Sequence, residues 1–428
     1  MIDGTSGAHI DGTDLTRVRE TPGARIVGLD LARFVAIVGM MATHVWFYAD
    51  LDTGERVGFS ALFDGRASAL FAVLAGVGII LSTRTTLLTR SRMAARRMLV
   101  GRGAALIATG LTLGLLQPPM LVILVYYGVL FWFLALALTW PHRALIAAGV
   151  IIVFAVPVLA SAVGLWSGIG NTTEADNPSW LDFADPLALL RGVLFTGIYP
   201  VSIWLAYGVV GMLIGRALVG ARSRKELRSI AIRLGATGAG VWLLGLAAAA
   251  AVQNALSVAD AAMIDVDAIG RPFAGSWLFL LGTGPHTGTS LDLLLTIGCA
   301  VTAIGVLVLF GTVLGARAQR ILGPVIGAGR APLTVYSAHV IFVACTVIFV
   351  TGKPYGALTA GDLGAISTTW WISSAEFYAA NVVLALLIGT VVVLLSRRGP
   401  LEAFVTWVGR RAADIGPLAP SRTGSQVR

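Results

Sequence analysis

The stretch RIVGLDLARFVAIVGMMATHVWFY, from Arg25 to Tyr48, decides the fold and carries the first candidate site. It is apolar and long enough to cross a bilayer, which takes about 20 residues. It nevertheless contains Asp30, Arg33 and His44. Ionisable groups inside a spanning helix are costly, so they are usually paired and face protein or water. The stretch therefore predicts a first membrane-spanning helix with a polar face.

The spacing places these three ionisable residues on one face of that helix. Asp30 and Arg33 are three residues apart, and Arg33 and His44 are eleven apart. Eleven helical steps return to within about 20° of the same direction, after a rise of about 16 Å. We interpret this face as a functional lining that runs much of the way across the membrane. The alternative is an ion pair near the inner surface and an unrelated histidine near the outer one.

The composition of the whole chain indicates an all-α, polytopic integral membrane protein. Its 428 residues have a mean hydropathy of +0.84, and only 12% are charged, whereas a soluble domain carries about 25%. The apolar runs are continuous and do not alternate, which excludes a β-barrel. The net charge of +9 comes mainly from arginines in short loops between apolar runs. This pattern is typical of cytoplasmic loops and gives no reason to expect nucleic acid.

Ten apolar segments predict about ten spanning helices, with both termini in the cytoplasm and the protein in the cell membrane. They cover approximately residues 25–48, 67–83, 98–116, 121–140, 144–165, 189–216, 234–252, 291–314, 332–350 and 375–396. We expect residues 25–398 to form a single transmembrane domain. Residues 1–24 are expected to be a disordered cytoplasmic tail, and residues 399–428 a cytoplasmic C-terminal tail. Pro200 predicts a kink or a helix start in the sixth segment.

Histidines are the candidate acid–base groups. A neutral histidine can take and return a proton near pH 7, so His44, His286 and His339 are candidate general bases. His286 could instead be a surface loop histidine, and His339 a buried one bonded to a neighbour such as Tyr336. The sequence has no metal-ligand spacing and no G-x-S-x-G motif. We therefore expect no metal.

The arginine-rich loop before the third segment has two interpretations. It can orient the protein by the positive-inside rule. Alternatively, its arginines can bind a phosphate-rich cytosolic ligand, because guanidinium forks match phosphate geometry. Arg102 is the strongest candidate because it lies inside the third segment, where a free charge would be costly. Arg97, in the same loop, is the second candidate.

The pattern G-L-D-x-x-R-x-x-A-I-x-G-M-x-x-x-H, from Gly28 to His44, resembles the first helix of the transmembrane acyltransferase superfamily. The chain looks most like the bacterial YeiB-like proteins, which are related to heparan-α-glucosaminide N-acetyltransferase. It is also similar, more distantly, to the acyltransferase-3 branch. Further short segments that resemble the same bacterial group are Phe63–Gly76, Thr196–Tyr207, Pro285–Ser290 and Arg330–His339.

The resemblance implies a membrane enzyme that moves an acyl group, commonly acetyl from cytosolic acetyl-CoA, to an acceptor on the far side. By position, His44 matches the catalytic histidine of the acyltransferase-3 branch, and Arg33 the arginine associated with the acyl donor. The glucosaminide acetyltransferases keep their catalytic histidine in the loop after the first helix. Residues 49–66 contain no histidine. Either His44 or His286 replaces it, or the activity differs.

We therefore expect an acyltransferase in which Arg33, Arg102 and Arg97 bind acetyl-CoA or another acyl-CoA. Its acyl arm would extend along the polar face toward His44, the general base, with Asp30 orienting Arg33. The acceptor would be a hydroxyl or amine of a glycan or lipid. The candidates for the acceptor side are Asp64, Arg66, Tyr199, His286 and His339.

Three alternatives stay open. Asp64 and Arg66 could simply pair with each other at the surface. The protein could be a proton-coupled transporter or flippase of a lipid-linked or small anionic solute, with His44 as the proton-coupling group. It could also be a sensor or assembly subunit without chemistry of its own. The expected partners are acyl-CoA, the acceptor and membrane lipids, and a homodimer stays open.

Overall fold

The computed structural model describes residues 25–46, 48–49, 56–166, 177–257, 277–369 and 371–415. Within these residues, eight helices are long and apolar enough to cross a membrane. They are α1 (Val27–Val45), α2 (Arg66–Thr89), α5 (His142–Trp166), α7 (Val201–Gly220), α8 (Arg224–Ala255), α10 (Ser290–Val313), α13 (Pro332–Thr351) and α15 (Ala375–Leu394). The prediction of an all-α polytopic membrane protein is confirmed.

The two other predicted spans are also helical. They are α3 (Arg92–Gly114), which carries four arginines, and α4 (Leu124–Ala137), which has only 14 residues. Pro200 immediately precedes α7, so the predicted helix start is confirmed. The predicted tail 1–24 and the last part of the C-terminal tail, 416–428, lie outside the described residues.

Shorter elements join the long helices. Strands β1 (Tyr48–Ala49) and β2 (Arg56–Val57) pair antiparallel, with Tyr48 opposite Val57. The short helices are η1 (Ser60–Leu62), η2 (Trp180–Ala184), α6 (Pro186–Arg191), η3 (Gly192–Thr196), η4 (Trp277–Leu281), α11 (Ala316–Ile321), α12 (Gly323–Arg330), η5 (Tyr355–Ala357), α14 (Ala360–Thr368) and α16 (Pro400–Asp414). These connections leave the long helices free to pack side by side.

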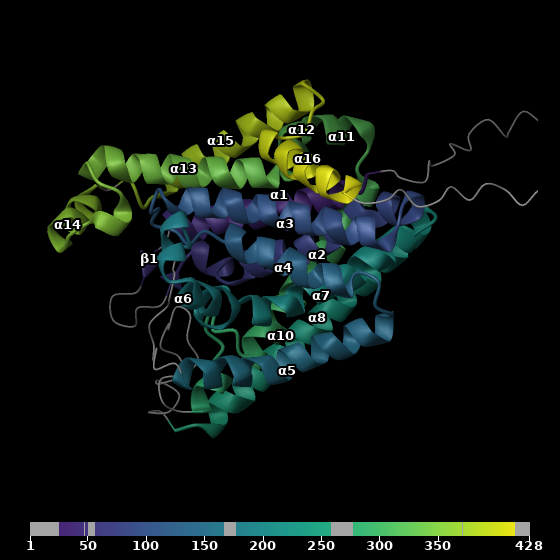
Figure 1. Cartoon of the computed structure of the whole chain (residues 1–428), viewed down its shortest axis with the longest axis horizontal. Helices are drawn as coiled ribbons and strands as arrows, with labels where there is room; N and C mark the ends of the chain where they lie inside the picture. The colour runs from purple at the N-terminus through teal and green to yellow at the C-terminus, as the bar shows by residue number, and fades with distance from the viewer. Residues whose placement is uncertain are drawn as a thin grey trace, which may run out of the picture.

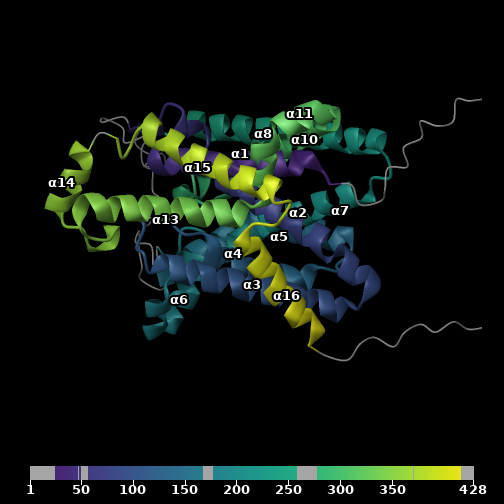
Figure 2. The same ribbon diagram turned by 90° about the horizontal axis from the view of Figure 1, so that it is seen from above.

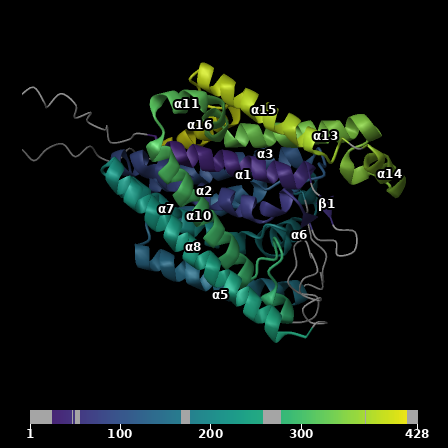
Figure 3. The ribbon, with the colours of Figure 1, turned by 180° about the vertical axis from the view of Figure 1, so that it is seen from behind.

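The long helices run roughly along the long axis of the molecule, with α13 and α15 on one side and α5 and α8 on the other (Figures 1 and 3). In the most apolar 18-residue stretch of each helix, only 11% of the residues of α8 and 22% of those of α5 are buried, against 61% for α1 and 72% for α2. A helix that is apolar but little buried presents its side chains to lipid. We therefore place α1 and α2 in the protein core and α5 and α8 at its lipid-facing side.

Helix α16 occupies part of the predicted C-terminal tail and crosses α3 obliquely (Figure 2). Gly101 of α3 and Gly409 of α16 meet at this crossing, where a Cβ on Gly101 would lie 3.3 Å from the Cα of Gly409. Small residues allow two helix backbones to approach this closely. The face of α16 that contains Val405 and Gly409 is buried. Residues 400–414 are therefore packed onto the helical bundle.

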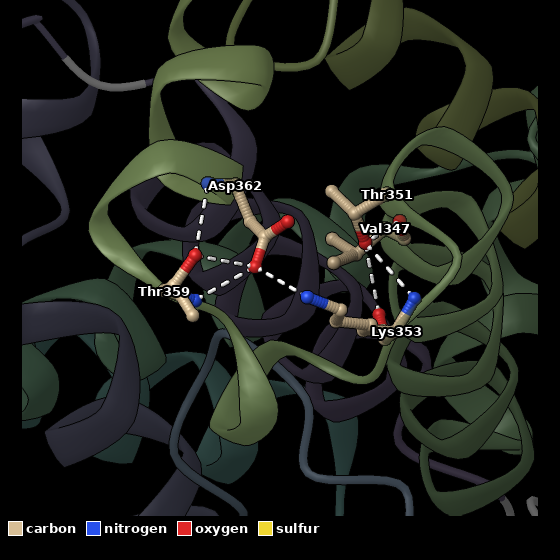
Figure 4. A network of polar contacts seen from close by, with 5 residues as sticks. All are labelled: Val347, Thr351, Lys353, Thr359 and Asp362. Carbon is tan, nitrogen blue, oxygen red and sulfur yellow. Dashed lines mark hydrogen bonds and ion pairs between the residues drawn. The ribbon is translucent and has the colours of Figure 1, made fainter.

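Helix α14 projects beyond the other helices at one end (Figures 1 and 2). Its start is held by Asp362, whose Oδ2 accepts hydrogen bonds from Lys353 Nζ at 2.9 Å and from the backbone nitrogen of Thr359 at 2.9 Å (Figure 4). Lys353 and Thr359 hold the pKa of the Asp362 carboxyl well below its usual range. This network attaches α14 to the end of α13.

The bundle has two chemically different ends. Gly28 in the first turn of α1 packs against Leu307 and Val308 near the end of α10, so the two helices are antiparallel. We call this the basic end, because Arg25 and the arginines described below lie there. The opposite end, where α1 finishes and α10 begins, carries His44 and His286, and we call it the histidine end.

Candidate functional site

A large open cleft of about 2270 Å³ enters the bundle at the basic end. Its arginines are Arg25, Arg33, Arg84, Arg90, Arg102, Arg222, Arg224, Arg330, Arg397, Arg398 and Arg410. Its acidic residues are Asp30, Glu402 and Asp414. Farther in, the lining becomes apolar, with Phe71, Leu74, Leu106, Leu124, Tyr127 and Phe131. A strongly positive mouth above an apolar inner end suits an anion that carries a long, less polar arm.

Asp30 joins two arginines in this cleft. The carboxylate is 1% exposed and accepts hydrogen bonds from Arg33 Nη1 at 2.9 Å and from Arg25 Nη2 at 2.9 Å. The predicted pairing of Asp30 with Arg33 is therefore confirmed. Because one carboxylate serves two guanidinium groups, the cluster keeps a net positive charge toward the cleft.

The face of α1 between Arg33 and His44 is packed with apolar side chains. Ile37 is 1% exposed and Met40 is 5% exposed, and both belong to the hydrophobic core. The predicted polar face is thus polar at its two ends and apolar between them. The described inner end of the cleft lies between α2, α3 and α4, so it does not follow α1 toward His44.

At the histidine end, α1, α13 and α15 bring together two histidines and an asparagine. His44 Nδ1 lies 3.0 Å from His339 Nε2, and the two rings are nearly parallel, at 8°. His339 Nδ1 lies 2.7 Å from Asn381 Oδ1. His339 is 1% exposed and Asn381 is fully buried. Tyr336, considered above as a partner for His339, instead accepts a hydrogen bond from the backbone nitrogen of Ile123 at 3.2 Å.

The hydrogen bonds of Asn381 determine which nitrogens of the neutral histidines carry hydrogen. Asn381 Nδ2 donates to the carbonyl oxygen of Phe377 at 2.8 Å, so Oδ1 is the atom that faces His339. An amide oxygen only accepts, so His339 Nδ1 must donate and its Nε2 must accept. His44 Nδ1 then donates to His339, and the lone pair of neutral His44 resides on Nε2. This is the arrangement that an oriented general base requires.

His286 and Tyr199 lie together elsewhere at the histidine end. Their ring centroids are 5.3 Å apart and their planes are nearly perpendicular. His286 has a φ of 62°, and it lines a small cavity of about 10 Å³ together with Ser68, Trp204 and Asp292. A cavity of this size holds about one water molecule. The structure therefore brings two of the predicted acceptor-side residues into contact.

The remaining predicted residues are distributed as follows. Arg66 begins α2 and its Nη1 donates to the carbonyl oxygen of Ala61 at 3.0 Å. Asp64 lies two residues before it in the chain, and its pairing with Arg66 stays a prediction. Arg102 lines the cleft, whereas Arg97 lies outside the cleft lining and donates to the carbonyl oxygen of Ile415.

One helical turn of α2 separates the cleft from the small cavity. Phe71 lines the cleft, and Ser68, three residues earlier, lines the cavity. Aromatic rings bridge the same interval: the Phe71 and Tyr127 centroids are 5.3 Å apart, and those of Tyr127 and Trp204 are 6.2 Å apart. The inner end of the cleft is therefore close to the cavity that His286 lines.

Sequence reasoning did not identify Asn381 or this set of aromatic residues. A lone asparagine inside an otherwise apolar span was the available signal, because an amide in hydrocarbon needs a partner. The aromatic residues gave no comparable signal, since aromatic side chains are common in apolar helices.

The family model of the heparan-alpha-glucosaminide N-acetyltransferase catalytic domain matches residues 25–245, which is more than half of the 428 residues. The chain therefore belongs to this family of membrane acetyltransferases, and the predicted relationship is confirmed. The matched range contains Arg33, His44 and Arg102, while His286, His339 and Asn381 follow it. No curated protein matches the chain.

Proposed function

We propose that this protein transfers an acyl group from an acyl-CoA, held in the arginine-lined cleft, to a hydroxyl or amine presented at the histidine end. The acyl group is acetyl, as the family indicates, and the acceptor is a glycan or lipid. The observation that carries the proposal is the cleft itself: eleven arginines line it, and its apolar inner end stops one helical turn short of the second cavity. The basic end faces the cytoplasm, in agreement with the positive-inside rule.

The cleft can hold a coenzyme A thioester by its two contrasting regions. The phosphates would bind among the arginines, because guanidinium groups form short, bidentate hydrogen bonds with phosphate oxygens. The pantetheine arm would follow the apolar inner wall past Leu106 and Leu124 toward Phe71 and Tyr127. The thioester would then arrive between the cleft and the histidine end.

His44 would act as the general base at the histidine end, and the acyl arm would have to extend beyond the inner end of the cleft to reach it. The acceptor oxygen or nitrogen attacks the thioester carbonyl carbon while His44 Nε2 takes its proton. The C–S bond then breaks, the acyl group stays on the acceptor, and the proton passes to the departing thiolate. His339 and Asn381 would not touch the substrate, and they would position His44 by fixing its ring and tautomer. His286 and Tyr199 would contact the acceptor.

The test is acetyl transfer from radiolabelled acetyl-CoA by protein reconstituted in vesicles. We expect His44→Ala to lower the transfer rate by about 10²- to 10⁴-fold, the usual contribution of a general base, with unchanged affinity for acetyl-CoA. His142→Ala is the matched control, because His142 is an exposed histidine at the start of α5, and we expect it to retain wild-type transfer.

Two results would contradict this proposal. If His286→Ala abolished transfer while His44→Ala retained it, His286 would be the base. If the wild type bound no acetyl-CoA and moved a labelled lipid-linked or anionic solute across the vesicle unchanged, the protein would be the transporter considered above.

A further inference from the structure

Arg102 has a buried nitrogen that forms no hydrogen bond. This atom, Nε, is completely buried, and Nε has no hydrogen-bond partner in the part of the chain that the structure describes. The rest of its side chain lines the cleft, where Met98 and Leu106 lie one turn below and one turn above it on α3. A guanidinium placed this way between apolar neighbours is costly unless an anion meets it.

Helix α16 holds Arg102 in this position. A Cβ added to Gly409 of α16 would lie only 2.6 Å from Arg102 Cγ, so the glycine leaves room for the arginine stem between the two helices. Because the stem already packs against the backbone of α16, it cannot move farther toward that helix. The guanidinium group is therefore directed into the cleft by a helix that follows the last spanning segment.

The same helix holds a second arginine near the first. Arg398 Nη1 donates to Thr406 Oγ1 of α16 at 3.0 Å, and Arg398 also lines the cleft. Thr406, which Arg398 contacts, and Gly409, which Arg102 contacts, are three residues apart and therefore neighbours on one face of α16. Two like charges in a partly desolvated place repel each other, and an anion between them removes this cost.

The acidic groups of the cleft are engaged with other residues. Asp30 bonds Arg25 and Arg33, and Asp414 pairs with Arg90. Glu402 Oε1 accepts from the backbone nitrogen of Leu333 at 2.6 Å, and Oε2 accepts from Thr334 Oγ1 at 2.6 Å, which ties α16 to the start of α13. Burial raises the pKa of the Glu402 carboxyl, and these hydrogen bonds lower that pKa in part. Among the described residues, none of these three carboxylates forms a hydrogen bond with Arg102 or Arg398.

We infer that Arg102 and Arg398 form a seat for one phosphate group of the donor, and that α16 completes this seat. The inference rests on the proposed function, because it takes the donor to be a coenzyme A thioester. It adds that the C-terminal helix belongs to the donor site. The phosphate is either the 3′-phosphate of the ribose or part of the diphosphate, and both offer the same chemistry to two guanidinium groups.

Competition binding tests the inference with three probes: coenzyme A, 3′-dephospho-coenzyme A and pantetheine. We expect Arg102→Met to weaken coenzyme A binding by about 10- to 100-fold, as is typical when a hydrogen bond to a charged group is lost. Pantetheine, which has no phosphate, should bind the variant as it binds the wild type. Arg320→Met is the control, because Arg320 is an exposed arginine of α11 outside the cleft lining, and it should change neither affinity.

A second variant keeps α3 intact. Thr406→Val removes the hydrogen bond that holds Arg398, so we expect a loss of several-fold in coenzyme A affinity, again with pantetheine unchanged. The dephospho compound then identifies the phosphate. If Arg102→Met no longer weakens its binding, the seat holds the 3′-phosphate, and if the loss persists, the seat holds the diphosphate.

Two outcomes overturn the inference, and they differ from each other. In the first outcome, the wild type binds coenzyme A, and Arg102→Met either binds it as tightly as Arg320→Met does or loses as much affinity for pantetheine as for coenzyme A. There is then no phosphate seat, and the proposed function stands. If the wild type does not bind coenzyme A at all, the proposed function fails and the inference fails with it.

Discussion

At the basic end, Asp30 and its arginines border a wide cleft, whereas at the histidine end His44, His339 and Asn381 bond to one another within packed helices. The first arrangement keeps formal charges where a polar ligand can reach them. The second uses groups that can all be neutral, which lowers the cost of burial. The difference suggests a division of labour, with ligand charge bound at one end and a proton moved at the other.

Removing the carboxylate of Asp30 should have the largest effect on stability. Asp30→Ala leaves Arg33 without its carboxylate in a buried place, which typically costs about 3–5 kcal/mol of the free energy of unfolding. Denaturant unfolding in detergent measures this loss. Asp414→Ala is the matched control at the same end, because Asp414 is 54% exposed where it pairs with Arg90, and such exposed pairs contribute about 0–1 kcal/mol. Equal losses for the two variants would show that burial of Asp30 is unimportant.

A change at Asn381 should affect the histidine end and leave donor binding alone. Asn381→Leu removes the acceptor for His339 Nδ1, and we expect transfer to slow by up to about 100-fold, the cost of a misplacement of roughly 1 Å. Asn381→Asp keeps an acceptor oxygen there, so it should restore much of the rate. Steady-state kinetics provide the test, with kcat reduced and the KM for acetyl-CoA unchanged. If both variants lose donor affinity, the two ends are not independent.

The smallest effect is expected at α14, outside both sites (Figure 4). The pKa of Asp362 is lowered by Lys353, so its charged form stabilises the fold above the usual aspartate pKa of about 3.9. This contribution is lost as the pH falls below that value. Between pH 5 and pH 3, the protection of the amide hydrogens at the start of α14, corrected for the pH dependence of intrinsic exchange, should therefore begin to fall. Asp362→Asn should lower the protection at pH 5 by a larger factor, because the folded Asp362 carboxyl is still charged at pH 3. Transfer activity should be unaffected by this variant.

Much of the architecture follows from local sequence. Ten apolar segments predicted ten helices, Pro200 predicted the start of α7, and the three-residue spacing predicted that Asp30 would meet Arg33. These are properties of one helix or one turn, and the physical rules that govern them act over a few residues.

The candidate site depended on contacts between distant segments. His44 and His339 are 295 residues apart in the chain, and Asn381 follows on yet another helix. The sequence placed residues 399–428 in a tail, yet α16 lies against α3 and borders the cleft. Its amphipathic pattern is too short and too polar to predict a spanning helix, and its partner surface on α3 does not exist until the bundle has packed.

The sequence by itself determined that the chain is a helical membrane protein of an acyltransferase family, with charge on one face of its first helix. The membrane class and the charged face rest on hydropathy and on residue spacing within single segments, and the family rests on the resemblance of the Gly28–His44 pattern. Only the tertiary structure decided that this face is interrupted by Ile37 and Met40, and that the inner end of the cleft lies between α2, α3 and α4. It also brought His339 and Asn381 into hydrogen-bond distance of His44 and of each other, respectively. The reason is that helices in a membrane associate through close packing of particular side chains, which no single segment specifies.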